Sequence, residues 1–140
     1  MTKRYADDMT KEKYLLQARN LRVDLESALM ELEDAEAYAK KTTVAYSDLP
    51  VKSGRNVHRL EDATIILMEK KEAAQKKIDE LYTLKEEICE RITTVGNARL
   101  EQVLRLYYID GRNWREVALI MRKHVRTVYR MKDEAIKRMK

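Results

Sequence analysis

The sequence predicts an all-α protein, in which a long antiparallel helical hairpin precedes a C-terminal three-helix domain that contains a helix-turn-helix. Charged residues make up 38% of the 140 residues, while Gly occurs 3 times and Pro once. This composition suits long exposed helices and disfavours a sheet protein. Apolar residues recur at alternating steps of four and three before the spacing shortens near residue 98. We therefore expect residues 1–96 to form the hairpin and residues 97–140 the helix-turn-helix domain.

The first helix of the expected hairpin starts near Thr10 and fades across residues 40–50, where Pro50 marks a connection. About 33 helical residues would extend roughly 50 Å. Its apolar seam has heptad spacing and consists of Tyr14, Ala18, Leu21, Leu25, Ala28, Leu32, Ala35 and Ala39.

The second helix follows residues 51–56, and Met68 and Leu84 widen its apolar stripe. Gly96 suits a left-handed helix end, and Asn97 can cap the helix that follows. Its expected seam keeps the same step, although Lys71 and Lys85 interrupt it and part of it is expected to be solvated or to face a partner. The seam consists of Leu60, Thr64, Leu67, Lys71, Ala74, Ile78, Leu81, Lys85, Ile88, Ile92 and Val95.

A hairpin of two long helices buries little area for its length, so packing on another copy would stabilise it. We expect a homo-oligomer, with a dimer favoured. The hairpin carries no chemistry of its own, and we interpret it as an oligomerisation or partner-docking arm.

The last third of the chain shows three short helical patterns, at residues 98–109, 114–121 and 125–139. Gly111 and Asn113 supply a turn and an N-cap between the first two. Ala118 stands where the first helix of a helix-turn-helix needs a small residue at its closest approach to the second. A single basic amphipathic helix, the alternative interpretation, would explain neither Ala118 nor the break at residues 122–124.

Positive charge is concentrated in this same segment. Residues 98–140 contain 12 Lys and Arg against 5 Asp and Glu, a balance of +7, whereas residues 1–97 have a balance of −2. Such a distribution is typical of a nucleic-acid-binding module on a neutral scaffold. A basic tail that serves only solubility is the alternative.

The phase of the last helix separates its inner from its outer residues. With Val128, Met131 and Ala135 inward, the residues on the opposite face of its N-terminal half, Val125 among them, would point outward. This end of the helix would enter a major groove first. Arg126 and Arg130 would reach guanine or phosphate oxygens, and Tyr129 a phosphate or a thymine methyl group. The candidate DNA-binding residues comprise this outer face and the basic residues around the turns, where phosphate contacts form: Arg112, Arg115, Arg122, Lys123, His124, Val125, Arg126, Tyr129 and Arg130.

The segment "LRLYYIDGRNWREVALIMRKHVRTVYRMKDEAIKRM" resembles region 4 of sigma-70 factors. In organisation the whole chain is similar to the sigma-region-4-like, ArpU/RinA-type transcriptional regulators of phages and prophages. The resemblance implies a DNA-binding regulator of phage late genes in the cytoplasm of a bacterial host, with RNA polymerase as a further partner. Two positions depart from the pattern: Arg122 stands where Gly is common, and His124 where a Ser N-cap is common.

Catalysis is not expected. His58, His124 and Cys89 lie far apart in the sequence, and no metal-ligand spacing or phosphate-binding loop is present, so we expect no enzyme, no cofactor and no metal. A single cysteine is compatible with a reducing cytoplasm, and no apolar run reaches membrane-spanning length.

Two alternative functions stay open. One is a DNA-packaging recognition protein similar to a small terminase subunit, which would form a ring. The other is a protein-binding adaptor that docks its helix-turn-helix on RNA polymerase without binding DNA. Double-stranded DNA is the partner that we favour.

Overall fold

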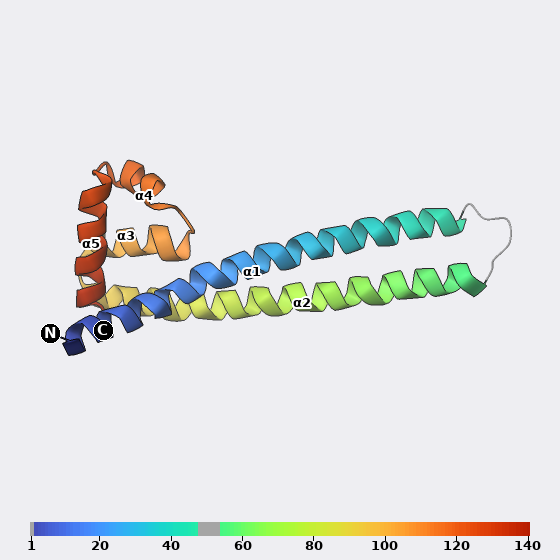
Figure 1. The fold of residues 1–140 in the computed structure, drawn as a ribbon, viewed down its shortest axis with the longest axis horizontal. Coiled ribbons are helices and arrows are strands. Elements are labelled where there is room, and N and C mark those ends of the chain that lie inside the picture. The colour runs from blue at the N-terminus through green and yellow to red at the C-terminus, as the bar shows by residue number, and fades with distance from the viewer. Residues whose placement is uncertain (1, 48–53) are drawn as a thin grey trace. The chain divides into compact units, whose positions relative to one another are not determined.

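The computed structural model describes residues 2–47 and 54–140, and within them the side chains of residues 7–44 and 58–140. No strand occurs in these ranges, so the predicted all-α class is confirmed (Figure 1). The helices are α1 (Thr2–Ser47), α2 (Gly54–Ile92), the 3₁₀ turn η1 (Thr93–Val95), α3 (Ala98–Leu104), the π-helical turn η2 (Arg105–Ile109), α4 (Trp114–Met121) and α5 (Val125–Arg138).

The first helix is longer than the sequence predicted. It starts at Thr2 rather than near Thr10, and it continues through residues 40–47, which we had assigned to the connection. No Gly or Pro interrupts these residues, and Thr43 satisfies its hydroxyl by donating to the carbonyl of Ala39 at 2.8 Å. Pro50 lies outside the described residues.

The chain forms two compact units, one of Met1–Arg22 with Leu81–Lys140 and one of Val23–Glu80. Their limits fall inside α1 and α2, whereas the sequence had suggested one boundary between residues 96 and 97. The reason is that Leu15 of α1 and Ile88 of α2 are fully buried in one core with Leu104 and Tyr108.

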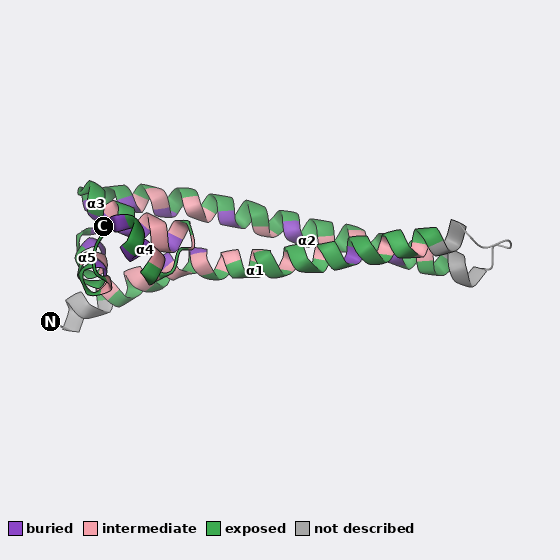
Figure 2. Cartoon of the chain, turned by 90° about the horizontal axis from the view of Figure 1, so that it is seen from above, coloured by how far each residue is buried: buried purple, intermediate pink, exposed green. Residues whose placement is uncertain are grey.

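In the unit of residues 23–80, two antiparallel helical segments meet along a narrow seam (Figures 1 and 2). On α1 the seam follows the predicted heptad positions, all of which are buried or half-buried. The exposed Lys70–Glu31 ion pair, at 2.9 Å, also joins the two segments. Alanines are the only buried residues among those described in this unit, namely Ala35, Ala63 and Ala74. The unit therefore has a thin core.

On α2 the predicted seam needs a correction. Thr64, Lys71 and Ile78 are exposed, as is Met68, whereas the preceding positions are buried or half-buried. Alanine allows close helix approach, and lysine covers the seam with its aliphatic stem while its ammonium group stays in water. The side chains that line the seam in place of the predicted ones are Ala63, Lys70 and Lys77.

The other unit has two neighbouring apolar clusters. In the first, residues of α1 and α2 pack with α3, η2 and the C-terminal half of α5. In the second, the predicted residues Val117, Ala118, Met121 and Val128 pack with Val103 of α3. The second cluster joins α4 to α5, and Tyr107 and Met131 lie against both clusters. Together they fix α4 and α5 on a base that includes α1 and α2.

Candidate nucleic-acid interface

The turn between α4 and α5 is closed by backbone hydrogen bonds around Arg122. Arg122 N–H donates to Leu119 O at 3.2 Å, and Lys123 N–H donates to Ala118 O at 3.0 Å. This pair of bonds is the Schellman arrangement, in which the residue after the helix is usually glycine. Arg122 adopts it with φ 55° and ψ 43°, as the one non-glycine residue with positive φ in the described chain. The turn is therefore formed as the glycine pattern requires, with a strained arginine in that place.

His124 caps the N-terminus of α5. Its Nδ1 atom accepts a hydrogen bond from Arg126 N–H at 3.1 Å, and its backbone is extended, as an N-cap requires. Since Nδ1 accepts this bond, the proton of the neutral imidazole resides on Nε2. Histidine thus fulfils the capping role that serine commonly has.

The start of α4 is capped as the sequence predicted. Asn113 Oδ1 accepts from Glu116 N–H at 2.9 Å, and Asn113 Nδ2 donates to Glu116 Oε1 at 2.8 Å. Glu116 also pairs with Arg112 at 3.3 Å. Arg112 is exposed, but this carboxylate neutralises part of its charge.

Five other candidate cations lie in the first turn of α4, in the α4–α5 turn and in the first turns of α5. All are exposed, and no carboxylate of the described residues pairs with any of them. They are Arg115, Arg122, Lys123, Arg126 and Arg130, and we name them the turn cations.

Two of the candidate residues on α5, Val125 and Tyr129, also contact other parts of the protein. Val125 was expected to point outward, but it is half-buried and packs against the cluster of Val117, Val128 and their neighbours. Its methyl groups are covered because it begins the helix directly beside the α4–α5 contact. Tyr129 is 43% exposed, and its ring lies 5.5 Å from that of Trp114. Tyr129 thus contacts Trp114 and remains exposed.

The charge of α5 changes along its length. Residues 125–131 contain Arg126 and Arg130 and no acid, and they include the positive end of the helix dipole. Asp133 and Glu134 follow, each next to a cation, at 3.3 Å from Lys132 and 3.0 Å from Arg138 respectively. The N-terminal half of α5 is therefore the part best suited to a polyanion.

An aromatic cluster of Tyr107, Tyr108 and Trp114 packs next to the N-terminal half of α5. The rings of Tyr107 and Trp114 are stacked, with centroids 3.8 Å apart and planes 10° from parallel. Tyr108 presents its edge to both rings, at 4.8 Å from Tyr107 and 6.5 Å from Trp114. Tyr108 is 1% exposed, its hydroxyl has no hydrogen-bond partner among the described residues, and burial raises its pKa well above the usual value.

Two arginines of α1 hold the C-terminal end of the helix formed by α3 and η2. Arg19 Nη1 donates to the carbonyls of Tyr107 and Arg112, at 2.7 Å and 3.0 Å, and Arg22 Nη2 donates to the carbonyl of Ile109. Cations at a helix C-terminus satisfy its last carbonyls and interact favourably with its dipole. The π-helical turn brings these carbonyls together at the point where α1 passes.

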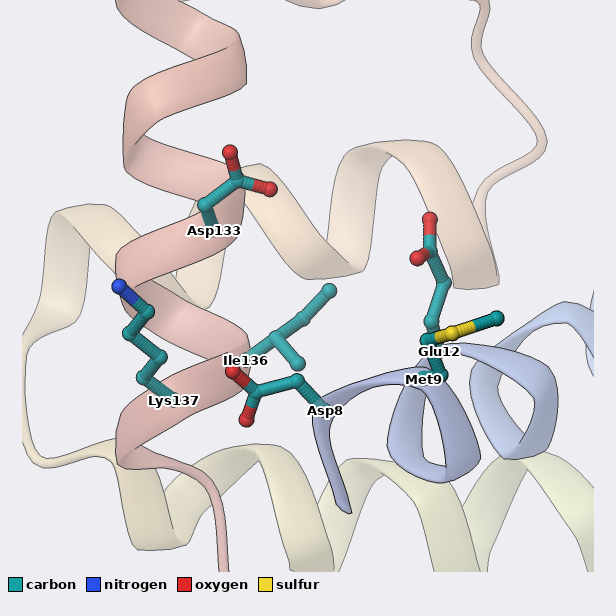
Figure 3. Close-up of a pocket in the computed structure, with 6 residues that line it drawn as sticks. All are labelled: Asp8, Met9, Glu12, Asp133, Ile136 and Lys137. Atoms are coloured by element: carbon teal, nitrogen blue, oxygen red, sulfur yellow. The ribbon is translucent and has the colours of Figure 1, made fainter. Parts of the chain in front are cut away.

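On another face of α5, three residues of α1 oppose three of α5 across a cavity of about 350 Å³. Figure 3 shows this cavity with its lining residues Asp8, Met9, Glu12, Asp133, Ile136 and Lys137. Lys132 lies near it and pairs with Glu12 at 3.5 Å. Its acidic lining makes this face unsuitable for DNA.

Several residues of the region were not among the candidates predicted from the sequence. Thr127 is exposed in the first turn of α5, and the helical phase could have placed it there. Leu119 and Ile120 are 79% and 43% exposed on α4. Arg19 and Arg22 gave no signal, because their partners are backbone carbonyls about ninety residues away.

Within the described residues, no group of three or more His, Cys, Asp or Glu side chains is placed to hold a metal ion. Among the helices described, none has the length and apolar character needed to cross a membrane.

Residues 40–140 match the family model described as "Protein of unknown function (DUF1492)". The chain belongs to this family. The DUF1492 match covers all of η1, α3, η2, α4 and α5, together with α2. No curated protein and no solved structure shows a significant match to the chain.

Proposed function

We propose that this protein is a sequence-specific DNA-binding transcriptional regulator that uses α4 and α5 as a helix-turn-helix. The observation that carries the proposal is that the five turn cations are exposed and without carboxylate partners in the described chain, and that four of them lie in the α4–α5 turn and the N-terminal half of α5, with Arg115 at the start of α4. In this role α5 enters the major groove with its N-terminal end leading.

The cations divide into two roles by position. Arg126 and Arg130 lie four residues apart on the exposed face of α5, so one face of the helix presents both to base edges or phosphates. Arg122 and Lys123 lie in the α4–α5 turn and Arg115 in the first turn of α4, and from these positions they are assigned to the phosphate backbone, whose contacts fix register and orientation. Tyr129 and Thr127 add hydroxyl groups to the same surface.

The proposed regulator acts on phage or prophage late genes in the host cytoplasm, as the resemblance to the sigma-region-4-like, ArpU/RinA-type regulators implies, with RNA polymerase as a second partner. It acts as a homo-oligomer, with a dimer favoured. Support for self-association comes from the unit of residues 23–80, whose buried described residues are all alanines while Met30 and Met68 are 66% and 57% exposed.

The test is a binding assay of the pure protein against fragments of the genome that encodes it, at two salt concentrations. Preference for one upstream fragment, with affinity that falls steeply as salt rises, is the expected result. Mass measurement in solution separates regulation from packaging: a dimer agrees with the proposal, whereas a closed ring of about eight or more subunits favours a packaging protein.

A protein adaptor is the remaining alternative, and the exposed Leu119 and Ile120 of α4 are the observation that favours it. It predicts no DNA binding even at low salt. Such a result would contradict the proposed function.

A further inference from the structure

A continuous series of contacts runs from α1 to the exposed face of α5. Arg19 contacts Tyr107, Tyr107 stacks on Trp114, and Trp114 contacts Tyr129. We propose that Arg19 is a positioning residue for DNA recognition, which sets the orientation of Tyr129 through the Tyr107–Trp114 stack. This inference rests on the proposed function.

Arg19 fixes both the backbone and the ring of Tyr107. Its Nη1 atom donates to the Tyr107 carbonyl at 2.7 Å and to the Arg112 carbonyl at 3.0 Å, while its Cζ atom lies 3.9 Å from the centre of the Tyr107 ring. A guanidinium group can do this because it is planar, donates in several directions and stacks on aromatic faces. Lysine cannot reproduce the combination.

The stack transmits this constraint to Trp114. Tyr107 lies parallel to the indole at 3.8 Å, and the buried Tyr108 meets both rings edge-on. Lys132 Nζ lies 5.8 Å from the centre of the indole ring. Trp114 is half-buried, and side chains of η2 and α5 contact its ring and restrict its orientation.

Tyr129 lies at the end of this series. Its ring is 5.5 Å from Trp114 with planes at 57°, while 43% of the residue is exposed on the DNA-facing side. Loss of Arg19 frees the Tyr107 ring, lets the indole rotate and broadens the orientations of Tyr129. Its contribution to DNA binding then falls, although Arg19 itself touches no DNA.

A purely structural role for Arg19 makes a different prediction. In that case its replacement lowers stability, but Tyr129 contributes as much to DNA binding as before. Two measurements on the full chain distinguish the roles, with Arg19→Met and the milder Arg19→Lys as variants. Lys13→Met is the matched control, because Lys13 is an exposed cation on the same helix.

The first measurement uses Trp114, the only tryptophan in the sequence, in the protein without DNA. Arg19→Met is expected to shift the indole emission to longer wavelength and to increase its quenching by acrylamide, with unchanged helical circular dichroism, whereas Lys13→Met leaves the emission as in wild type. Identical emission from Arg19→Met and wild type would overturn the inference.

The second measurement is a double-mutant cycle on the DNA dissociation constant with Arg19→Met and Tyr129→Ala. Each change is expected to raise the dissociation constant by some factor. In the double variant the increase is expected to be smaller than the product of the two single factors, by roughly threefold or more, because both changes remove the same interaction. For Lys13→Met combined with Tyr129→Ala, the increase in the dissociation constant is expected to equal the product of the two single factors. If the wild-type protein binds DNA and the effects of Arg19→Met and Tyr129→Ala on the dissociation constant simply multiply, this inference alone is overturned. Absence of DNA binding by the wild-type protein overturns the proposed function and the inference with it.

Discussion

His124 Nδ1 accepts a hydrogen bond from the backbone N–H of Arg126 at 3.1 Å, so the side chain that caps α5 lies beside the first cation of its exposed face. The cap also fixes where α5 begins, and hence the position of Arg126.

Loss of this cap is expected to cost stability. His124→Ala should lower the free energy of unfolding by about 1 kcal/mol, because an N–H at the start of α5 loses its side-chain acceptor. His124→Asn and His124→Ser should retain most of the wild-type value, since both supply a capping oxygen. Urea denaturation measures all three, and an alanine variant as stable as wild type would show that the imidazole does not act as a cap.

Arg122 holds a left-handed backbone that glycine adopts without strain. Arg122→Gly is expected to raise the free energy of unfolding by about 1 kcal/mol, whereas Arg122→Ala, which keeps a Cβ atom, should bring no such gain. Both variants remove one turn cation and should weaken DNA binding to a similar extent. If glycine brought no more stability than alanine, the strain at Arg122 would be refuted.

Gly96 and Gly111 form a matched pair, with φ of 76° and 75°. A Cβ atom at Gly96 would meet nothing within 4 Å, whereas one at Gly111 would lie 3.1 Å from Cδ and Nε of Arg22. Gly96→Ala should therefore cost about 1 kcal/mol of stability from strain alone. Gly111→Ala should cost roughly 2 kcal/mol or more, because the Arg22 contact with Ile109 must also shift. Thermal unfolding compares the two, and equal losses would contradict the close packing of Arg22.

Tyr108 has a buried hydroxyl with no partner among the described residues. Tyr108→Phe is expected to stabilise the protein by about 1 kcal/mol at neutral pH, because it removes an unsatisfied polar group and keeps the ring.

The same residue should affect stability at alkaline pH. Burial raises the pKa of Tyr108 in the folded state, and an unfolded tyrosine ionises near pH 10. The unfolded chain therefore loses this proton first, so wild-type stability should fall relative to Tyr108→Phe as the pH rises above about 10. Urea titrations at pH 8 and pH 11 measure the difference, and a constant gap between the two proteins would argue against the buried, neutral phenol.

The short helices of the C-terminal third could be predicted closely from the sequence, because each boundary has a local cause. Asn97 and Asn113 accept hydrogen bonds from the first N–H groups of α3 and α4, and Gly96 and Gly111 have the positive φ of helix ends and turns. Local side-chain chemistry and helical phase suffice for such elements.

The α2 seam and the contacts of α1 could not be predicted in this way. On α2 two neighbouring sets of positions have heptad spacing, one with Ala63 and one with Thr64. Packing against the partner helix decides which set is buried. Arg19 and Arg22 bind carbonyls that only the tertiary fold brings near. Long-range packing, which a single sequence does not encode as a pattern, decided these features.

Two double variants of α5, one in each half of the helix, show whether its N-terminal half reads DNA. Arg126→Ala with Arg130→Ala removes two cations from the N-terminal half, and Lys137→Ala with Arg138→Ala removes two exposed cations from the C-terminal end. Fluorescence anisotropy with the preferred DNA fragment, over a series of salt concentrations, compares the two double variants. The first should lose most of the affinity and lower the salt slope by about 2, whereas the second should bind nearly as wild type. Equal affinities and slopes for the two double variants would contradict the account.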